Sequence, residues 1–99
     1  MSQRKFSEDK ELLAIIERLE AMKAEGRTLY LDPEQYEDIV EYYILEKKKD
    51  RAHEVIASGL KIHPGNSRII VLQIALYLEE AKVQEARDLV NEILHDNSL

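Results

Sequence analysis

Carboxylates gather on one side of a predicted helix, in the stretch that follows Pro33. Glu34, Glu37, Asp38 and Glu41 recur there at helical spacing, opposite an apolar stripe. Two carboxylates can act as general acid and base only where an apolar pocket raises the pKa of one of them. These four lie on a face that the pattern predicts to be solvated. The pattern therefore favours a merely solvated helix face, or a surface that attracts cationic groups, over a catalytic pair.

The other residue types that perform chemistry are absent or scattered. The chain has no Cys, and no Ser lies in a nucleophile-elbow context. His53, His63 and His95 form neither an i, i+4 pair nor a zinc-protease pattern, so each is expected at the surface or at a helix end. We therefore expect no enzyme activity, no metal site and no cofactor.

Charge and composition narrow the class of partner. The 99 residues suit one domain with a modest core, and the net charge of −6 has the wrong sign for nucleic acid or an anionic membrane. The run Lys47–Lys49 is short and is flanked by Glu46 and Asp50. The start of the chain lacks an apolar run of signal-peptide length, and no apolar run is long enough to span a membrane. The lack of Cys fits a reducing compartment. The sequence thus predicts a cytoplasmic protein that binds other proteins.

Hydrophobic periodicity predicts an all-α chain. Apolar residues recur at helical spacing in five segments, at about residues 7–24, 33–47, 50–62, 67–80 and 83–95. The fourth segment contains the most apolar run, Ile69–Leu78, in which only Gln73 is clearly polar. A helix that is apolar on every side is expected to be sandwiched between neighbours.

Capping residues and glycines mark the ends of these segments. Residues that can cap a helix stand before four of them, at Ser7, Asp32, Asp50 and Asn66. The strongest signal is Asp32 with Pro33 and Gln35, which predicts a capping box. Gly26 is expected to end the first helix, and Leu29–Leu31 to hold the following connection to the core. Gly59, on an apolar face, predicts that a neighbouring backbone comes close.

The chain repeats itself with a period of 34 residues. Identical residues occur at this spacing in the pairs Tyr43/Tyr77, Lys48/Lys82, Ala52/Ala86 and Leu60/Leu94. Apolar character is also kept at Val40/Ile74, Ile44/Leu78, Val55/Leu89 and Ile56/Val90. Each unit is predicted to be a helix, a turn and a second helix. A period of this length is typical of stacked helical hairpins.

The pattern resembles the tetratricopeptide repeat (TPR) family. Residues 33–66 look like one repeat and 67–99 like a second. The family's signature residues fall at Tyr43 and Tyr77 in the first helix of each repeat and at the small Ala52 and Ala86 in the second, and Pro64 closes the first repeat as the family's terminal Pro does. The chain departs from the family at Ile39-Val40 and Gln73-Ile74, at Gly59, and at Ser98 in place of a second closing Pro. The resemblance implies one continuous domain of antiparallel helix pairs in a right-handed superhelix, with residues 1–32 packed on the first repeat. The whole is similar to the N-terminal part of longer bacterial TPR proteins.

The resemblance also implies a concave groove that binds a protein or peptide. The positions that would line it are Glu34, Glu37, Glu41, Ile44, Leu45, Arg68, Val71, Ala75, Leu78 and Glu79. An acidic and apolar groove suits a basic, amphipathic segment. The family's carboxylate clamp, which grips chaperone tails, is not expected, because it needs Lys and Asn where Glu37 and Glu41 stand.

A second predicted surface lies on the last helix. Leu89, Val90, Ile93 and Leu94 give it a broad apolar face, and little chain follows to cover it. We expect a second copy to cover this face across a two-fold axis, unless Leu99 and the tail fold back over it. The alternative function is therefore a structural end-unit of a longer solenoid, or a self-associating domain, with no peptide ligand of its own.

Overall fold

The computed structural model describes residues 9–96, which form five α-helices and no strand. The chain separates into two compact units, Met1–Leu31 and Asp32–Leu99. The first unit contains α1 (Lys10–Ala24), whose buried residues are Leu12, Ile16 and Leu19. The all-α class predicted from the sequence is confirmed, whereas the predicted packing of residues 1–32 on the first repeat stays a prediction.

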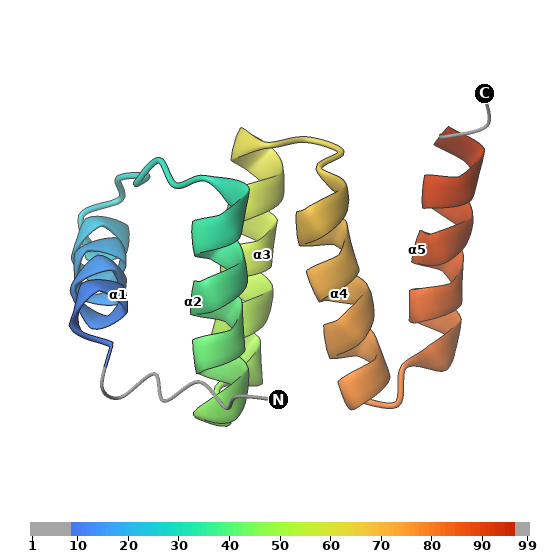
Figure 1. The fold of residues 1–99 in the computed structure, drawn as a ribbon, viewed down its shortest axis with the longest axis horizontal. Helices are drawn as coiled ribbons and strands as arrows, with labels where there is room; N and C mark the ends of the chain where they lie inside the picture. Colours follow the sequence, from blue (N-terminus) through green and yellow to red (C-terminus); the bar gives the residue numbers. More distant parts are fainter. Residues whose placement is uncertain (1–8, 97–99) are drawn as a thin grey trace. The chain divides into compact units, whose positions relative to one another are not determined.

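The second unit contains the other four helices, which are α2 (Pro33–Leu45), α3 (Lys49–Ile62), α4 (Ser67–Glu79) and α5 (Val83–Asp96). Successive helices run in opposite directions, so that α2 and α4 point the same way and α3 and α5 the other way (Figure 1). The extensive contacts join α2 with α3, α4 with α5, and α4 with both α2 and α3. The helix α4 therefore connects the two pairs.

The two helix pairs of this unit have the same layout along the chain. The bounds of α4 and α5 follow those of α2 and α3 by 34 residues at every end. The turns within the pairs also match, because Lys47 and Ala81 both adopt a left-handed backbone, with φ of 63° and 61°. The N–H groups of Lys48 and Lys82 each donate to the carbonyl of a Tyr five residues earlier, at 2.8 Å. The sequence period thus corresponds to a repeat of helix boundaries and turn geometry.

Local signals explain where most helices begin. The Asp32 carboxylate accepts from the Gln35 N–H, and the Gln35 side chain accepts from the Asp32 N–H, both at 2.9 Å. This is the predicted capping box. Asn66 accepts from the Ile69 N–H at 3.1 Å, so it caps α4 as predicted. Gly26 follows the end of α1 with a left-handed φ of 70°.

Two predicted helix starts need correction. The structure begins α1 at Lys10, because the Asp9 carboxylate accepts from the Leu12 N–H at 3.0 Å; the predicted cap Ser7 lies outside the described residues. The helix α3 begins at Lys49, ahead of the predicted cap Asp50, and its N-cap Lys48 makes no side-chain capping bond. The left-handed turn at Lys47 sets this start in place of a capping side chain.

The core of the second unit lies where α2, α3 and α4 meet. Its fully buried residues include Tyr36 and Ile39 from α2, Ile56 from α3, and Ile69 and Leu76 from α4. The helices approach each other closely at Gly59, since a Cβ there would stand 3.2 Å from both the Tyr36 ring and the Ile69 side chain. The close neighbours predicted at Gly59 are therefore side chains, not backbone. No polar or charged residue of the described chain is fully buried.

Candidate functional site

The predicted groove positions lie in two rows, one on α2 and one on α4. The α2 row is Glu34, Glu37, Glu41, Ile44 and Leu45, and the α4 row is Arg68, Val71, Ala75, Leu78 and Glu79. Because the two helices are in contact and run in the same direction, the two rows run alongside each other. We call them together the α2–α4 surface.

An ion pair joins the two rows near the start of both helices. Arg68 Nη1 donates to Glu37 Oε1 at 2.6 Å, a contact between residues 31 positions apart. Both side chains remain partly exposed, so solvent weakens the attraction between them. The pair shows that α2 and α4 present these side chains on one surface. It also means that the acidic character predicted for Glu37 is partly neutralised by Arg68.

The rest of the surface is largely apolar and open to solvent. Leu45, Val71 and Leu78 are 62%, 55% and 54% exposed, and Ala75 is exposed as well. Ile44 and Glu41 are half-buried, while Glu34 is exposed. Glu79 stands 3.8 Å from Lys49 Nζ on α3, which places a second ion pair beside the apolar residues. The surface therefore combines exposed apolar side chains with charged groups beside them.

The exposure of these residues corrects the prediction that α4 is sandwiched on every side. Ile69, Leu72 and Leu76 are buried against its neighbours, and Ile70, Ile74 and Tyr77 are half-buried. Val71, Ala75 and Leu78 recur at intervals of four and three residues, so they form one stripe that remains in solvent. The extensive contacts of α4 with α2, α3 and α5 bury its other apolar residues at least in part, but not this stripe.

His53 forms a polar link between the helix pairs, which sequence reasoning missed. Its Nε2 lies 2.9 Å from Glu80 Oε1 and its Nδ1 lies 3.2 Å from Gln73 Nε2. An amide nitrogen can only donate, so Nδ1 accepts from Gln73 and Nε2 donates to Glu80. His53 is thus half-buried within α3, not at the surface or a helix end as predicted. No local signal identifies it, because its partners lie 20 and 27 residues away.

The link changes the proton affinity of Glu80. The hydrogen bond from His53 lowers the pKa of this carboxyl, and the positive charges of Lys82 and Lys49 act in the same direction. Partial burial opposes them by raising the pKa. Lys82 Nζ lies 3.8 Å from Glu80, which adds a second positive neighbour. Glu80 is therefore held in its ionised form at the junction of α3 and α4.

The residues predicted for self-association divide between two sides of α5. Leu89 and Ile93 are half-buried, whereas Val90 and Leu94 are exposed by 38% and 64%. Val83, which was not in the predicted set, is 52% exposed. With Arg87 these exposed residues form one row along the helix, which we call the α5 row: Val83, Arg87, Val90 and Leu94. The predicted cover by Leu99 falls outside the described residues.

The described part of the chain offers little else that could act as a site. Within residues 9–96, no group of three His, Asp or Glu side chains is placed to hold a metal ion. None of the described helices has both the length and the apolar character that a membrane crossing requires. Comparisons with models of protein families, with curated proteins and with solved structures found no match.

Proposed function

We propose that this chain is a protein-binding module, which holds a partner segment on the α2–α4 surface. The observation that supports this most directly is the exposure of Leu45, Val71 and Leu78 beside the ion-paired Glu37 and Arg68. Apolar side chains that gather on one surface, with charged groups around them, are typical of sites that bind proteins. The partner that fits is a basic, amphipathic peptide or protein segment.

The resemblance to TPR proteins supports the same proposal. The 34-residue period, the matching helix bounds and the contacts of α4 with both α2 and α3 fit a TPR-like stack. In such a stack the α2–α4 surface would be the concave side of a right-handed superhelix. We also propose that the chain works in the cytoplasm, in keeping with its lack of Cys, and that it is similar to the beginning of a longer bacterial scaffold protein.

Binding of two matched peptides tests the proposal. One peptide is helical, with Lys on one face and Leu on the other, and its control has Glu in place of every Lys. We expect the Lys peptide to bind the full chain more tightly, and added salt to weaken its binding. The measurement is fluorescence anisotropy at two salt concentrations. Equal affinity for both peptides would count against an acidic, apolar site.

Substitutions then locate the site. Leu78→Glu should weaken the Lys peptide about tenfold or more by placing a charge among the apolar residues, and Glu37→Lys with Glu41→Lys should remove the preference for Lys. Leu94→Glu is the matched control, because Leu94 is also an exposed Leu but lies on α5. If Leu78→Glu and Leu94→Glu have the same effect, the α2–α4 surface is not the site. A chain that binds neither peptide supports the alternative of a structural or self-associating unit.

A further inference from the structure

The α5 row corresponds to the row of α3 that α4 covers. The contacts of α3 with α4 include Lys49, which lies 3.8 Å from Glu79, His53, which bonds Glu80, and Gly59, which approaches Ile69. Thirty-four residues after Lys49 and His53 stand Val83 and Arg87. Thirty-four residues after Ile56 and Leu60, on the same side of α3, stand Val90 and Leu94.

Burial differs sharply between the two rows. Ile56 is fully buried in the first pair, whereas its counterpart Val90 is 38% exposed. Leu60 is half-buried, and its counterpart Leu94 is 64% exposed. The α5 row also has Val83 in place of Lys49, so it is more apolar than the row that α4 covers. The α5 row therefore has the pattern of a helix-docking face.

The helix α4 shows what kind of segment covers such a row. It runs antiparallel to α3, so that Ile69 near its start meets Gly59 and Glu80 at its end meets His53. A covering helix of this kind thus presents apolar residues in its first turns and a carboxylate at its last turn. In the α3 row the carboxylates of Glu79 and Glu80 face basic partners.

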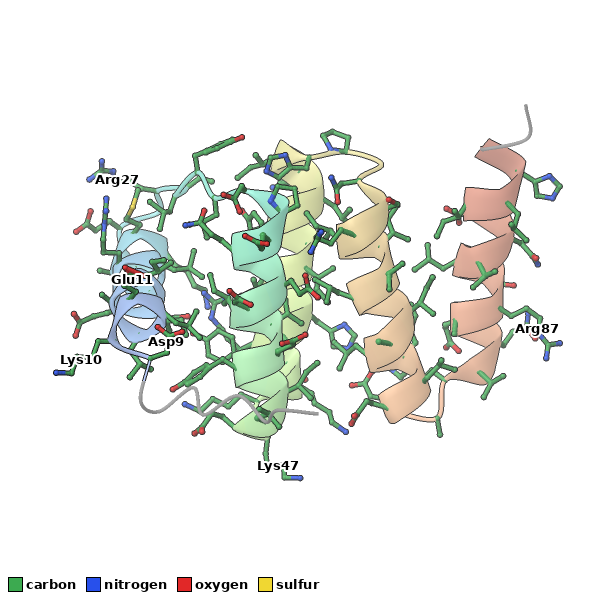
Figure 2. The ribbon with its side chains drawn as sticks, viewed as in Figure 1. Asp9, Lys10, Glu11, Arg27, Lys47 and Arg87 are labelled. Carbon is green, nitrogen blue, oxygen red and sulfur yellow. The ribbon has the colours of Figure 1, made fainter. Side chains whose placement is uncertain are left out.

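Arg87 provides the matching charge on α5. It stands where His53 stands in the first pair, and it projects from α5 on the side away from α4 (Figure 2). The guanidinium group makes no ion pair within residues 9–96. An Arg keeps its charge at every physiological pH and can bind a carboxylate through two parallel N–H groups.

We propose that the α5 row binds a partner helix that carries a carboxylate near its C-terminal end. The partner helix lies antiparallel to α5, as α4 lies on α3. Its carboxylate binds Arg87, and its apolar residues pack on Val90 and Leu94. This site is independent of the proposed α2–α4 site, because it uses a different helix and selects the opposite charge.

A second copy of the chain fits the α5 row less well. If the α5 helices of two copies pair across a two-fold axis with Val83 opposite Leu94, Arg87 of one copy lies opposite Val90 of the other. The two Arg87 side chains then lie within about one helical turn of each other. Two like charges over an apolar contact oppose association. The predicted two-fold dimer is therefore the competing outcome of the test.

A peptide with the sequence of residues 67–80 is the probe, because this segment already covers the equivalent row of α3. It is fluorescently labelled, and a reversed-charge probe has Glu79→Lys and Glu80→Lys. Anisotropy titrations use the full chain and its Arg87→Glu and Val90→Glu variants. Arg27→Glu, an equal charge change at an exposed residue in the other unit, is the control. Circular dichroism checks that each variant is folded.

We expect Arg87→Glu to weaken the first probe about tenfold and the reversed-charge probe to recover the lost affinity. Val90→Glu should weaken both probes, and Arg27→Glu neither. The proposal is overturned if the first probe does not bind the full chain, or if it binds Arg87→Glu as tightly. It is also overturned if sedimentation shows a dimer that Val90→Glu dissociates, because a second copy would then occupy the row. The effect of Leu78→Glu on binding of the Lys peptide tests only the proposed α2–α4 site, so failure of one proposal can be distinguished from failure of the other.

Discussion

The pairs α2–α3 and α4–α5 have the same boundaries and turns but differ in burial. Ile39, Val40 and Ile56 are fully buried in the first pair. Thirty-four residues later, the counterparts of Ile39 and Val40 are Gln73 and Ile74, which are half-buried. The counterpart of Ile56 is Val90, which is exposed. At Val90 the difference follows from the contacts, since α4 covers α3 while the extensive contact of α5 is with α4.

This comparison separates two roles of the repeated sequence. The local signals, which are the caps, the turns and the apolar periodicity, are similar in both pairs and determine the helical hairpin. Burial is not a property of the hairpin, because it depends on a helix supplied from outside the pair. The residues that differ most in burial between the pairs are therefore the residues where a partner would contribute most.

The largest expected difference is between Ile56→Ala and Val90→Ala. Ile56 is fully buried, so its truncation should lower the free energy of unfolding by about 2–5 kcal/mol. Val90→Ala removes a partly exposed side chain and should cost less than about 1 kcal/mol. Urea unfolding of both variants measures the two changes. Equal losses, which would mean that Val90 is buried in solution, would contradict the comparison.

A smaller difference is expected where the two pairs hold residues of different size. Gly59→Val forces its side chain against Tyr36 and Ile69 and should cost about 1–3 kcal/mol. At the counterpart position, Ile93→Val should cost roughly 0.5 kcal/mol, because Ile93 is only half-buried. Thermal unfolding compares the two variants. If Gly59→Val left stability unchanged, the close approach of α2, α3 and α4 would be wrong.

The smallest expected effect concerns the two residues that follow α2 and α4, which are Glu46 and Glu80. The pKa of Glu80 is lowered in the folded chain by His53, so its ionised form stabilises the fold above the ordinary carboxyl pKa. This stability is lost as the pH falls through the lowered pKa. Glu80→Gln should therefore reduce stability near neutral pH and flatten its decline in acid.

The matched control for that effect is Glu46→Gln, at the counterpart position, which is exposed. Urea midpoints between about pH 3 and pH 7 compare the two variants with the unchanged chain. A decline in acid that is as steep for Glu80→Gln as for Glu46→Gln would show that the His53 link does not stabilise the folded chain.

The sequence predicts well the helix starts that residues close in sequence determine. Asp32, Gln35 and Asn66 act on N–H groups within three residues, so the starts of α2 and α4 could be read from the chain. The start of α3 could not, because a left-handed residue at Lys47 sets it without a capping side chain. Ala81 repeats this turn, yet neither Lys nor Ala is typical of a left-handed conformation.

Burial and contacts that depend on residues far apart in the sequence were predicted only in part. An apolar run such as Ile69–Leu78 indicates burial, but it does not show that the stripe of Val71, Ala75 and Leu78 lacks a neighbour. Tyr30, expected to hold the connection to the core, is exposed, whereas Leu31 beside it is buried. The rows of the α2–α4 surface followed from the resemblance, but the ion pair between Glu37 and Arg68 needed the structure.

The limited contacts of α5 also have a consequence for the motions of the second unit. Each of α2, α3 and α4 makes extensive contacts with at least two other helices, whereas α5 does so with one. Helical stacks open most readily at the element with the fewest neighbours. We expect α5 to detach and reform while α2–α4 remain folded, and a helix bound to the α5 row would slow this opening.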